Sequence, residues 1–183
     1  MRLTNTDDGY GVVHWLIHWG TAGLVAWLFY LGLTMVDLPL SPAKFQDYAL
    51  HKSLGLTVLM LVLLRLLWRW LTPAPPLPDG MRRHEAVLAK VVHHGIYLLI
   101  LVIPLTGWLY ASATASPANY FGYFTVPDLM PASEAAAKLL RLVHDIAGKL
   151  LLFLLALHVI GALKHHFLDH DDVLKRMLRP LKD

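Results

Sequence analysis

Histidine is the residue whose number and placement stand out in this sequence. The chain has 183 residues and eleven histidines, while 56% of its residues are hydrophobic and only 16% are charged. Several histidines lie inside long apolar stretches, where an ionisable side chain is costly and indicates a function. Imidazole nitrogens bind transition metals and haem iron. The chain has no cysteine, which excludes disulfides, thiolate metal sites, iron–sulfur clusters and covalently attached haem.

Two histidines near the end of the chain have an informative spacing. His144 and His158 are fourteen residues apart. On a helix, fourteen steps of about 100° return to within roughly 40° of the same face, and fourteen rises of about 1.5 Å separate the side chains by about 21 Å. One helix face therefore offers two nitrogen ligands at two depths in the membrane.

Two earlier histidines can complete a pair at each of these depths. If consecutive spans are antiparallel, His18 in the first span reaches the depth of His158, and His51 at the start of the second span reaches the depth of His144. Two imidazole pairs inside a helix bundle are the arrangement that two b-type haems with bis-histidine ligation need. The predicted sites are therefore His18/His158 and His51/His144.

Arg65 adds a candidate anion contact to the first of these pairs. It follows His51 by fourteen residues, so it is expected on the same helix face, at the depth of His18 and His158. An arginine within a span needs an anionic partner or a route to the membrane surface. Binding of a haem propionate and snorkelling toward the surface explain Arg65 equally well.

The other histidines of the apolar stretches have a simpler interpretation. His14, His93 and His94 are expected to form hydrogen bonds between helices. His165 and His166 follow the last span and are expected at the membrane interface.

Four apolar stretches, each near the ~20 residues that a membrane-spanning helix needs, must position these residues. Lipid offers no partner to backbone polar groups, so such stretches must be helical. The acidic N-terminal segment is unlike a signal peptide, and the first span is expected to be retained. We predict an all-α integral membrane four-helix bundle, a single transmembrane domain over residues 1–183, with spans at approximately 13–36, 49–71, 91–111 and 139–163.

The basic residues predict the orientation of these spans. Eleven of the sixteen lysines and arginines fall on the side that holds both termini and the 72–90 loop. The positive-inside rule then places both termini in the cytoplasm, if the membrane is a bacterial inner membrane. The basic C-terminal tail is explained by topology and requires no nucleic-acid partner. The proline-rich 72–90 loop is expected to be extended, and the long 112–138 loop is expected to pack over the helix ends.

At these residues the chain resembles the bacterial cytochrome b561 family, which comprises dihaem proteins with four membrane helices. The resemblance covers nearly the whole chain. It implies that two haems b are bound by His18, His51, His144 and His158. Both His14 and His18 precede a tryptophan, and the depth in the membrane favours His18. The similarity is carried by Ile17-His18-Trp19, His51, Leu64-Arg65-Leu66-Leu67, His93 with Ile96-Tyr97-Leu98-Leu99, the His144/His158 spacing and Lys164-His165-His166-Phe167.

The resemblance also implies an oxidoreductase. Family members exchange electrons with the ubiquinone pool, and one branch oxidises superoxide. We therefore expect electron transfer between a periplasmic donor such as superoxide and ubiquinone, with membrane lipid and the quinone pool as partners. Clustered cations could attract an anion to the expected periplasmic entrance, although solvated positions explain them equally well. These cations are Lys52, Lys138, Arg141 and Lys149.

Two other functions stay open at this point. Related cytochromes are membrane subunits of hydrogenases, so the chain could anchor a hydrogenase or dehydrogenase, although its short loops offer little surface for docking. A histidine-based metal transporter is less favoured, because such sites are expected to mix histidine with carboxylates and the acid close to a span is Asp145. The sequence leaves the protein partner and the direction of electron flow open.

Overall fold

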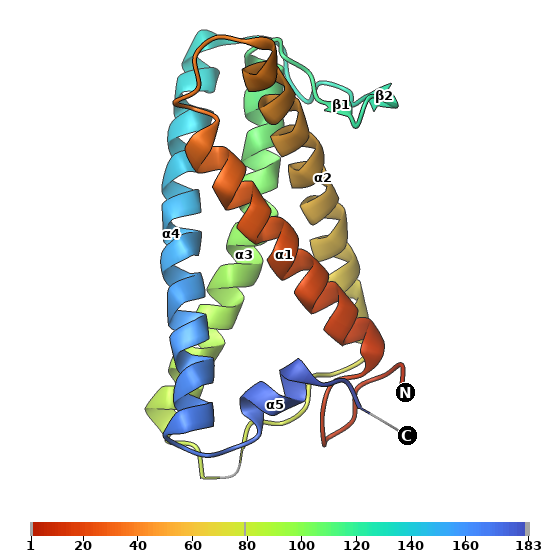
Figure 1. Cartoon of the computed structure of the whole chain (residues 1–183), viewed down its shortest axis with the longest axis vertical. Helices are drawn as coiled ribbons and strands as arrows, with labels where there is room; N and C mark the ends of the chain where they lie inside the picture. The colour runs from red at the N-terminus through yellow and green to blue at the C-terminus, as the bar shows by residue number, and fades with distance from the viewer. Residues whose placement is uncertain (1, 79, 182–183) are drawn as a thin grey trace. The chain divides into compact units, whose positions relative to one another are not determined.

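The computed structural model describes residues 2–78 and 80–181, which are mostly helical. Four long helices follow one another along the chain (Figure 1): α1 (Val12–Thr34), α2 (Pro42–Leu71), α3 (Arg83–Ala113) and α4 (Glu134–Phe167). The remaining elements are β1 (Asn119–Tyr120), β2 (Phe124–Thr125) and the short helix α5 (Val173–Leu178). All four long helices are long and apolar enough to cross a membrane. The predicted four-helix membrane fold is confirmed, and the orientation of the termini stays a prediction.

Three of the long helices extend beyond the predicted spans. The helix α2 begins at Pro42, α3 at Arg83 and α4 at Glu134, each several residues before its apolar stretch. Proline suits the first turn of a helix, and acidic side chains such as Glu134 are favourable there because the N-terminal end of the helix is partly positive. The predicted 72–90 loop was therefore too long, since its last eight residues belong to α3.

The surfaces of the long helices are apolar. Large apolar side chains are exposed along each of them, for example Tyr30 at 64%, Trp70 at 80% and Ile160 at 61%. Soluble monomers rarely expose so much contiguous apolar surface. In lipid the same surface needs no covering, so the exposure agrees with four membrane-spanning helices.

The chain forms two compact units, and each long helix contributes a part to both. Unit 1 comprises Met1–Gly20, Leu63–Leu98 and Leu150–Asp183. Unit 2 comprises Thr21–Val62 and Leu99–Lys149. The two predicted histidine pairs fall into different units, His18 and His158 into unit 1 and His51 and His144 into unit 2.

In unit 1 the segment after α4 is held against α1. The indole N–H groups of Trp15 and Trp19 donate to the carbonyl oxygens of Leu178 and Met177, at 3.3 and 2.9 Å. The backbone N–H of Leu181 donates to the carbonyl of Tyr10 at 3.0 Å. The basic C-terminal tail thus carries a short helix, α5, which the sequence analysis did not predict.

In unit 2 the long loop packs on α2 and α3, as expected. Ser53 Oγ accepts the backbone N–H of Phe121 at 3.1 Å, and Ser112 Oγ accepts that of Leu129 at 3.0 Å. The loop also contains an antiparallel hairpin of β1 and β2, which was not predicted. Gly122 has a φ of +84° in the hairpin turn, a conformation that glycine adopts without strain.

Candidate functional site

The first histidine pair lies in unit 2, between α2 and α4. The ring centroids of His51 and His144 are 6.3 Å apart, with an angle of 68° between the ring planes. His144 Nδ1 lies 3.0 Å from the carbonyl oxygen of Ile103 on α3. A carbonyl only accepts hydrogen bonds, so Nδ1 must carry the proton and Nε2 keeps a free lone pair. His144 is therefore held in the tautomer that binds a metal through Nε2.

Glycines of two neighbouring helices lie directly against these rings. A Cβ atom on Gly107 of α3 would lie 3.2 Å from His144 Cε1, and one on Gly32 of α1 would lie 3.4 Å from His51 Cε1. Each ring can approach the helix backbone because no side chain intervenes. The buried Nδ1 of His51 has no hydrogen-bond partner among the described residues. Nothing in the spacing of the sequence indicated these two glycines.

The second histidine pair lies in unit 1, between α1 and α4. The ring centroids of His18 and His158 are also 6.3 Å apart, with an interplanar angle of 54°. Arg65 of α2 places one guanidinium nitrogen 2.8 Å from His18 Nδ1. Arg65 thus lies beside this pair, as predicted, while its depth in the membrane stays a prediction.

The contact between Arg65 and His18 restricts the tautomer of His18. A guanidinium can only donate, so Nδ1 must accept and the ring proton must be on Nε2. Binding of a metal by Nε2 instead needs the proton on Nδ1, where it would face another donor. Arg65 must then find a different acceptor. Its Nε is buried and has no hydrogen-bond partner in the part of the chain that the structure describes, so the guanidinium has capacity for an additional acceptor.

The environment of Arg65 is cationic and aromatic. The Arg65 and Arg69 guanidiniums lie 5.1 and 5.4 Å from the centroid of the Tyr97 ring, within range of a cation–π interaction. Neither arginine forms an ion pair within residues 2–78 and 80–181. Two uncompensated cations inside membrane helices favour an anionic ligand at this position.

The hydrogen bonds predicted between helices for His14, His93 and His94 are not formed. His93 and His94 direct Nδ1 to carbonyl oxygens of their own helix, each at 2.6 Å. His14 is 4% exposed, stacks on Tyr10 at 4.5 Å and has no partner for Nδ1. His93 also lies 5.0 Å from His158, between ring centroids. For His93 and His94 the prediction was wrong because a histidine in a helix can donate to a carbonyl of the preceding turn.

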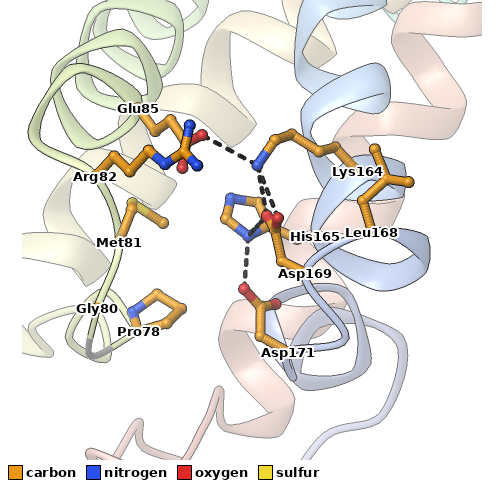
Figure 2. A pocket seen from close by; sticks show the side chains of 10 residues that line it. All are labelled: Pro78, Gly80, Met81, Arg82, Glu85, Lys164, His165, Leu168, Asp169 and Asp171. Carbon is orange, nitrogen blue, oxygen red and sulfur yellow. Dashed lines mark hydrogen bonds and ion pairs between the residues drawn. The ribbon is translucent and has the colours of Figure 1, made fainter.

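A polar pocket of about 420 Å³ lies elsewhere in unit 1, where α4 ends. Figure 2 shows the ammonium of Lys164 between Glu85 and Asp169, at 3.2 and 2.6 Å. His165 Nδ1 lies 2.6 Å from Asp171, and Asp171 also accepts the backbone N–H of Val173. His165 and the two aspartates could offer metal ligands. Because Lys164 already neutralises Asp169, these contacts are explained as the closure of the turn between α4 and α5.

Two of the four cations expected at an anion entrance are already engaged. Lys52 Nζ donates to the carbonyl of Ser116 at 2.7 Å, and Lys138 pairs with Glu134 at 2.6 Å. Arg141 and Lys149 are exposed.

Comparison with known proteins assigns the chain to a family. The family described as prokaryotic cytochrome b561 matches residues 9–180. The chain belongs to this family. With four helices of membrane-spanning length, this cytochrome b561 is a multi-pass protein of the bacterial inner membrane. It is a membrane haem protein of electron transfer, and the haem of this family is b-type.

Curated relatives agree with this assignment. The chain is 38% identical over 180 residues to cytochrome b561 homolog 2 of Escherichia coli (strain K12), covering 97% of this chain and 95% of the relative. It is 30% identical over 169 residues to the probable superoxide oxidase CybB of Yersinia pestis, covering 88% and 91%. It is 28% identical over 183 residues to cytochrome b562 of Cereibacter sphaeroides, covering 95% and 98%.

The geometry of both histidine pairs is compatible with haem. Two imidazoles that bind one metal from opposite sides, at about 2 Å each, hold their ring centres roughly 6 Å apart. Both pairs, at 6.3 Å, match this separation. His93, at 5.0 Å from His158, is too close to be the opposite ligand of the same iron. The residues present therefore fit the cofactor of the family.

Proposed function

We propose that this cytochrome b561 binds two haems b, one between His18 and His158 and one between His51 and His144. The equal separation of the two ring pairs, 6.3 Å, is the observation that carries the proposal. A bound haem supplies an iron that takes up and releases single electrons, so the chain needs no acid, base or nucleophile of its own.

The protein residues have separate tasks in this proposal. Ile103 orients His144 through the hydrogen bond from Nδ1, which leaves Nε2 available to iron. Arg65 binds a haem propionate, because iron ligation by His18 removes its present acceptor and a carboxylate suits a guanidinium. The apolar helices exclude water from both histidine pairs.

A haem count per chain tests the ligand assignment. We expect two non-covalent b haems in the purified protein, and one fewer in His144→Ala and in His158→Ala. The matched control is His94→Ala, because His94 is exposed and bonds only within its helix. A colourless protein after expression with adequate haem would overturn the proposal, and so would unchanged haem content in both variants.

We further propose that the electrons pass from a periplasmic donor such as superoxide to ubiquinone, which would make the protein an oxidoreductase. The support is the 30% identity to a probable superoxide oxidase and the exposed cations of unit 2. Cations concentrate an anionic substrate and raise its association rate, an effect that salt screens.

Charge reversal tests superoxide as the donor. Lys138→Glu with Arg141→Glu should slow haem reduction by superoxide and leave dithionite reduction unchanged. Lys90→Glu, on the side predicted to be cytoplasmic, is the control. Equal rates of haem reduction by superoxide in the unmodified protein, the double variant and Lys90→Glu would exclude electrostatic capture by Lys138 and Arg141. Stoichiometric co-purification of a larger soluble dehydrogenase or hydrogenase would instead favour the anchor-subunit alternative.

A further inference from the structure

The groups that contact the two histidine pairs differ in charge. In unit 1 one guanidinium nitrogen of Arg65 lies 2.8 Å from His18 Nδ1, and the centroid of the His18 ring lies 6.3 Å from that of His158. Arg69 stands one helical turn further along α2, against the same Tyr97 ring. No carboxylate in the described part of the chain pairs with either arginine. The His18/His158 pair is therefore in a positive environment.

In unit 2 the neighbouring groups are electron-rich. His144 Nδ1 donates to the Ile103 carbonyl at 3.0 Å, and the acidic residue Asp145 follows His144 directly on α4. Lys52 follows His51 in sequence but directs its ammonium to Ser116. Within the described residues, the group that contacts the His144 ring is thus an electron-rich carbonyl, and no cation contacts either ring of this pair.

These surroundings favour different oxidation states of a bound haem. Ferric haem carries one more positive charge than ferrous haem, so a nearby cation disfavours it, more strongly in a low-dielectric interior. An acceptor on Nδ1 makes the imidazole a stronger electron donor and favours the ferric state. Hydrogen bonding and nearby charge are the means by which a protein adjusts haem potentials.

We infer that the haem at His18/His158 has the higher reduction potential, and that Arg65 is the residue that raises it. Electrons then move from the His51/His144 site to the His18/His158 site. With haems held at both sites, one electron would leave the ferrous iron held by His51 and His144, making it ferric, and would reduce the ferric iron held by His18 and His158 to ferrous, with no proton exchanged. The inference rests on the proposed dihaem function. If Arg65 binds a propionate, it still raises the reduction potential, because the guanidinium then neutralises a carboxylate near the iron.

Spectroelectrochemical titration of the purified protein tests this order. Two one-electron transitions are expected. Arg65→Gln should lower the higher reduction potential, and Arg65→Lys should lower it less because the charge remains. Asp145→Asn should raise the lower reduction potential. Lys90→Gln is the control and should change neither. The expected shift for Arg65→Gln is about tenfold in the electron-exchange equilibrium constant, which is about 59 mV for one electron.

Single-haem variants assign the two transitions. His144→Ala should retain the higher transition and His158→Ala the lower. If these variants do not fold, the opposite shifts in Arg65→Gln and Asp145→Asn make the assignment. Two haems per chain with the reverse order, or a lower transition that responds to Arg65→Gln, would overturn this inference alone. Fewer than two haems per chain would instead overturn the proposed function.

Discussion

The two histidine pairs have the same ring separation, but different parts of the protein surround them. In unit 2, the His144 and His51 rings lie against Gly107 and Gly32, and a backbone carbonyl fixes one tautomer. In unit 1 the neighbours of His18 and His158 are side chains, Arg65 and His93 among them. Substitutions at the residues that contact the rings should therefore act mainly through size at the His51/His144 pair, and mainly through charge at Arg65 beside the His18/His158 pair.

The largest effect is expected where the backbone approaches a ligand ring. Gly107→Leu places a side chain where a Cβ alone would be 3.2 Å from His144 Cε1. Overpacking of this kind costs about 1–3 kcal/mol, enough to weaken haem binding by roughly 10- to 100-fold. Haem extraction should find the loss confined to the His51/His144 site.

Gly148→Leu is the matched control for that substitution. Gly148 lies on α4 in the same unit, and a Cβ there meets no atom within 4 Å. Equal haem content in the two leucine variants would mean that the close approach of Gly107 does not position His144.

The next effect concerns the loop of unit 2. Ser53 is 1% exposed; its hydroxyl accepts from Phe121 N–H and lies 3.1 Å from the Asn119 carbonyl oxygen. Ser53→Ala removes both hydrogen bonds between the loop and α2, at a cost of about 0.5–1.5 kcal/mol for each bond lost. Limited proteolysis in detergent should cleave the hairpin faster. Thr114→Val is the control, because the Thr114 hydroxyl bonds to the preceding turn of its own helix. If the hairpin were cleaved as fast in Thr114→Val as in Ser53→Ala, Ser53 would not be its anchor.

A smaller effect is expected from the histidine of unit 1 that is not assigned as a ligand. His93→Leu should keep both haems and alter the absorption of one, because the ring lies 5.0 Å from His158. His94→Leu should leave the spectrum unchanged. Loss of a haem in His93→Leu would contradict this prediction and would mean that His93 is needed for haem binding at the His18/His158 site.

The helices and the pairing of the histidines could be predicted because they depend on local patterns. Hydropathy marks a span, and a fourteen-residue spacing repeats a helix face, so the structure brings His18 to His158 and His51 to His144. The meeting of Arg65 with His18 follows from the same periodicity. Their roles as ligands and as a propionate contact stay predictions.

What could not be predicted depends on contacts between distant residues or on water. The hairpin of two-residue strands is anchored by Ser53, 68 residues before its partner Phe121. The short helix α5 is held by indoles of α1, and no hydropathy signal marks it. Helix ends such as Pro42 lie beyond the apolar stretches, where water can replace lipid and hydropathy no longer sets the boundary.

The smallest expected effect is a difference in pH response between the segment after α4 in unit 1 and the loop of unit 2. Lys164 donates hydrogen bonds to Asp169, which hold the pKa of that carboxyl below its usual value of 3.8. Because the pKa of Asp169 is lower in the folded protein than in the unfolded chain, the ion pair stabilises the segment after α4 at pH values above the unfolded-state pKa. This stabilisation is lost as the pH falls through the folded-state pKa. The loop of unit 2 is held by Ser53 and Ser112, whose hydroxyls do not titrate in this range.

Spin labels can follow the two segments separately, because the chain has no cysteine. A nitroxide at Leu178→Cys should gain mobility as pH falls below about 4, while one at Tyr123→Cys should not. Lys164→Met should mobilise the first label already at neutral pH, whereas Lys138→Met, which removes an exposed ion pair with Glu134, should not. If both labels gained mobility at one pH, the two segments would respond to a common transition, and Asp169 would not control the segment after α4.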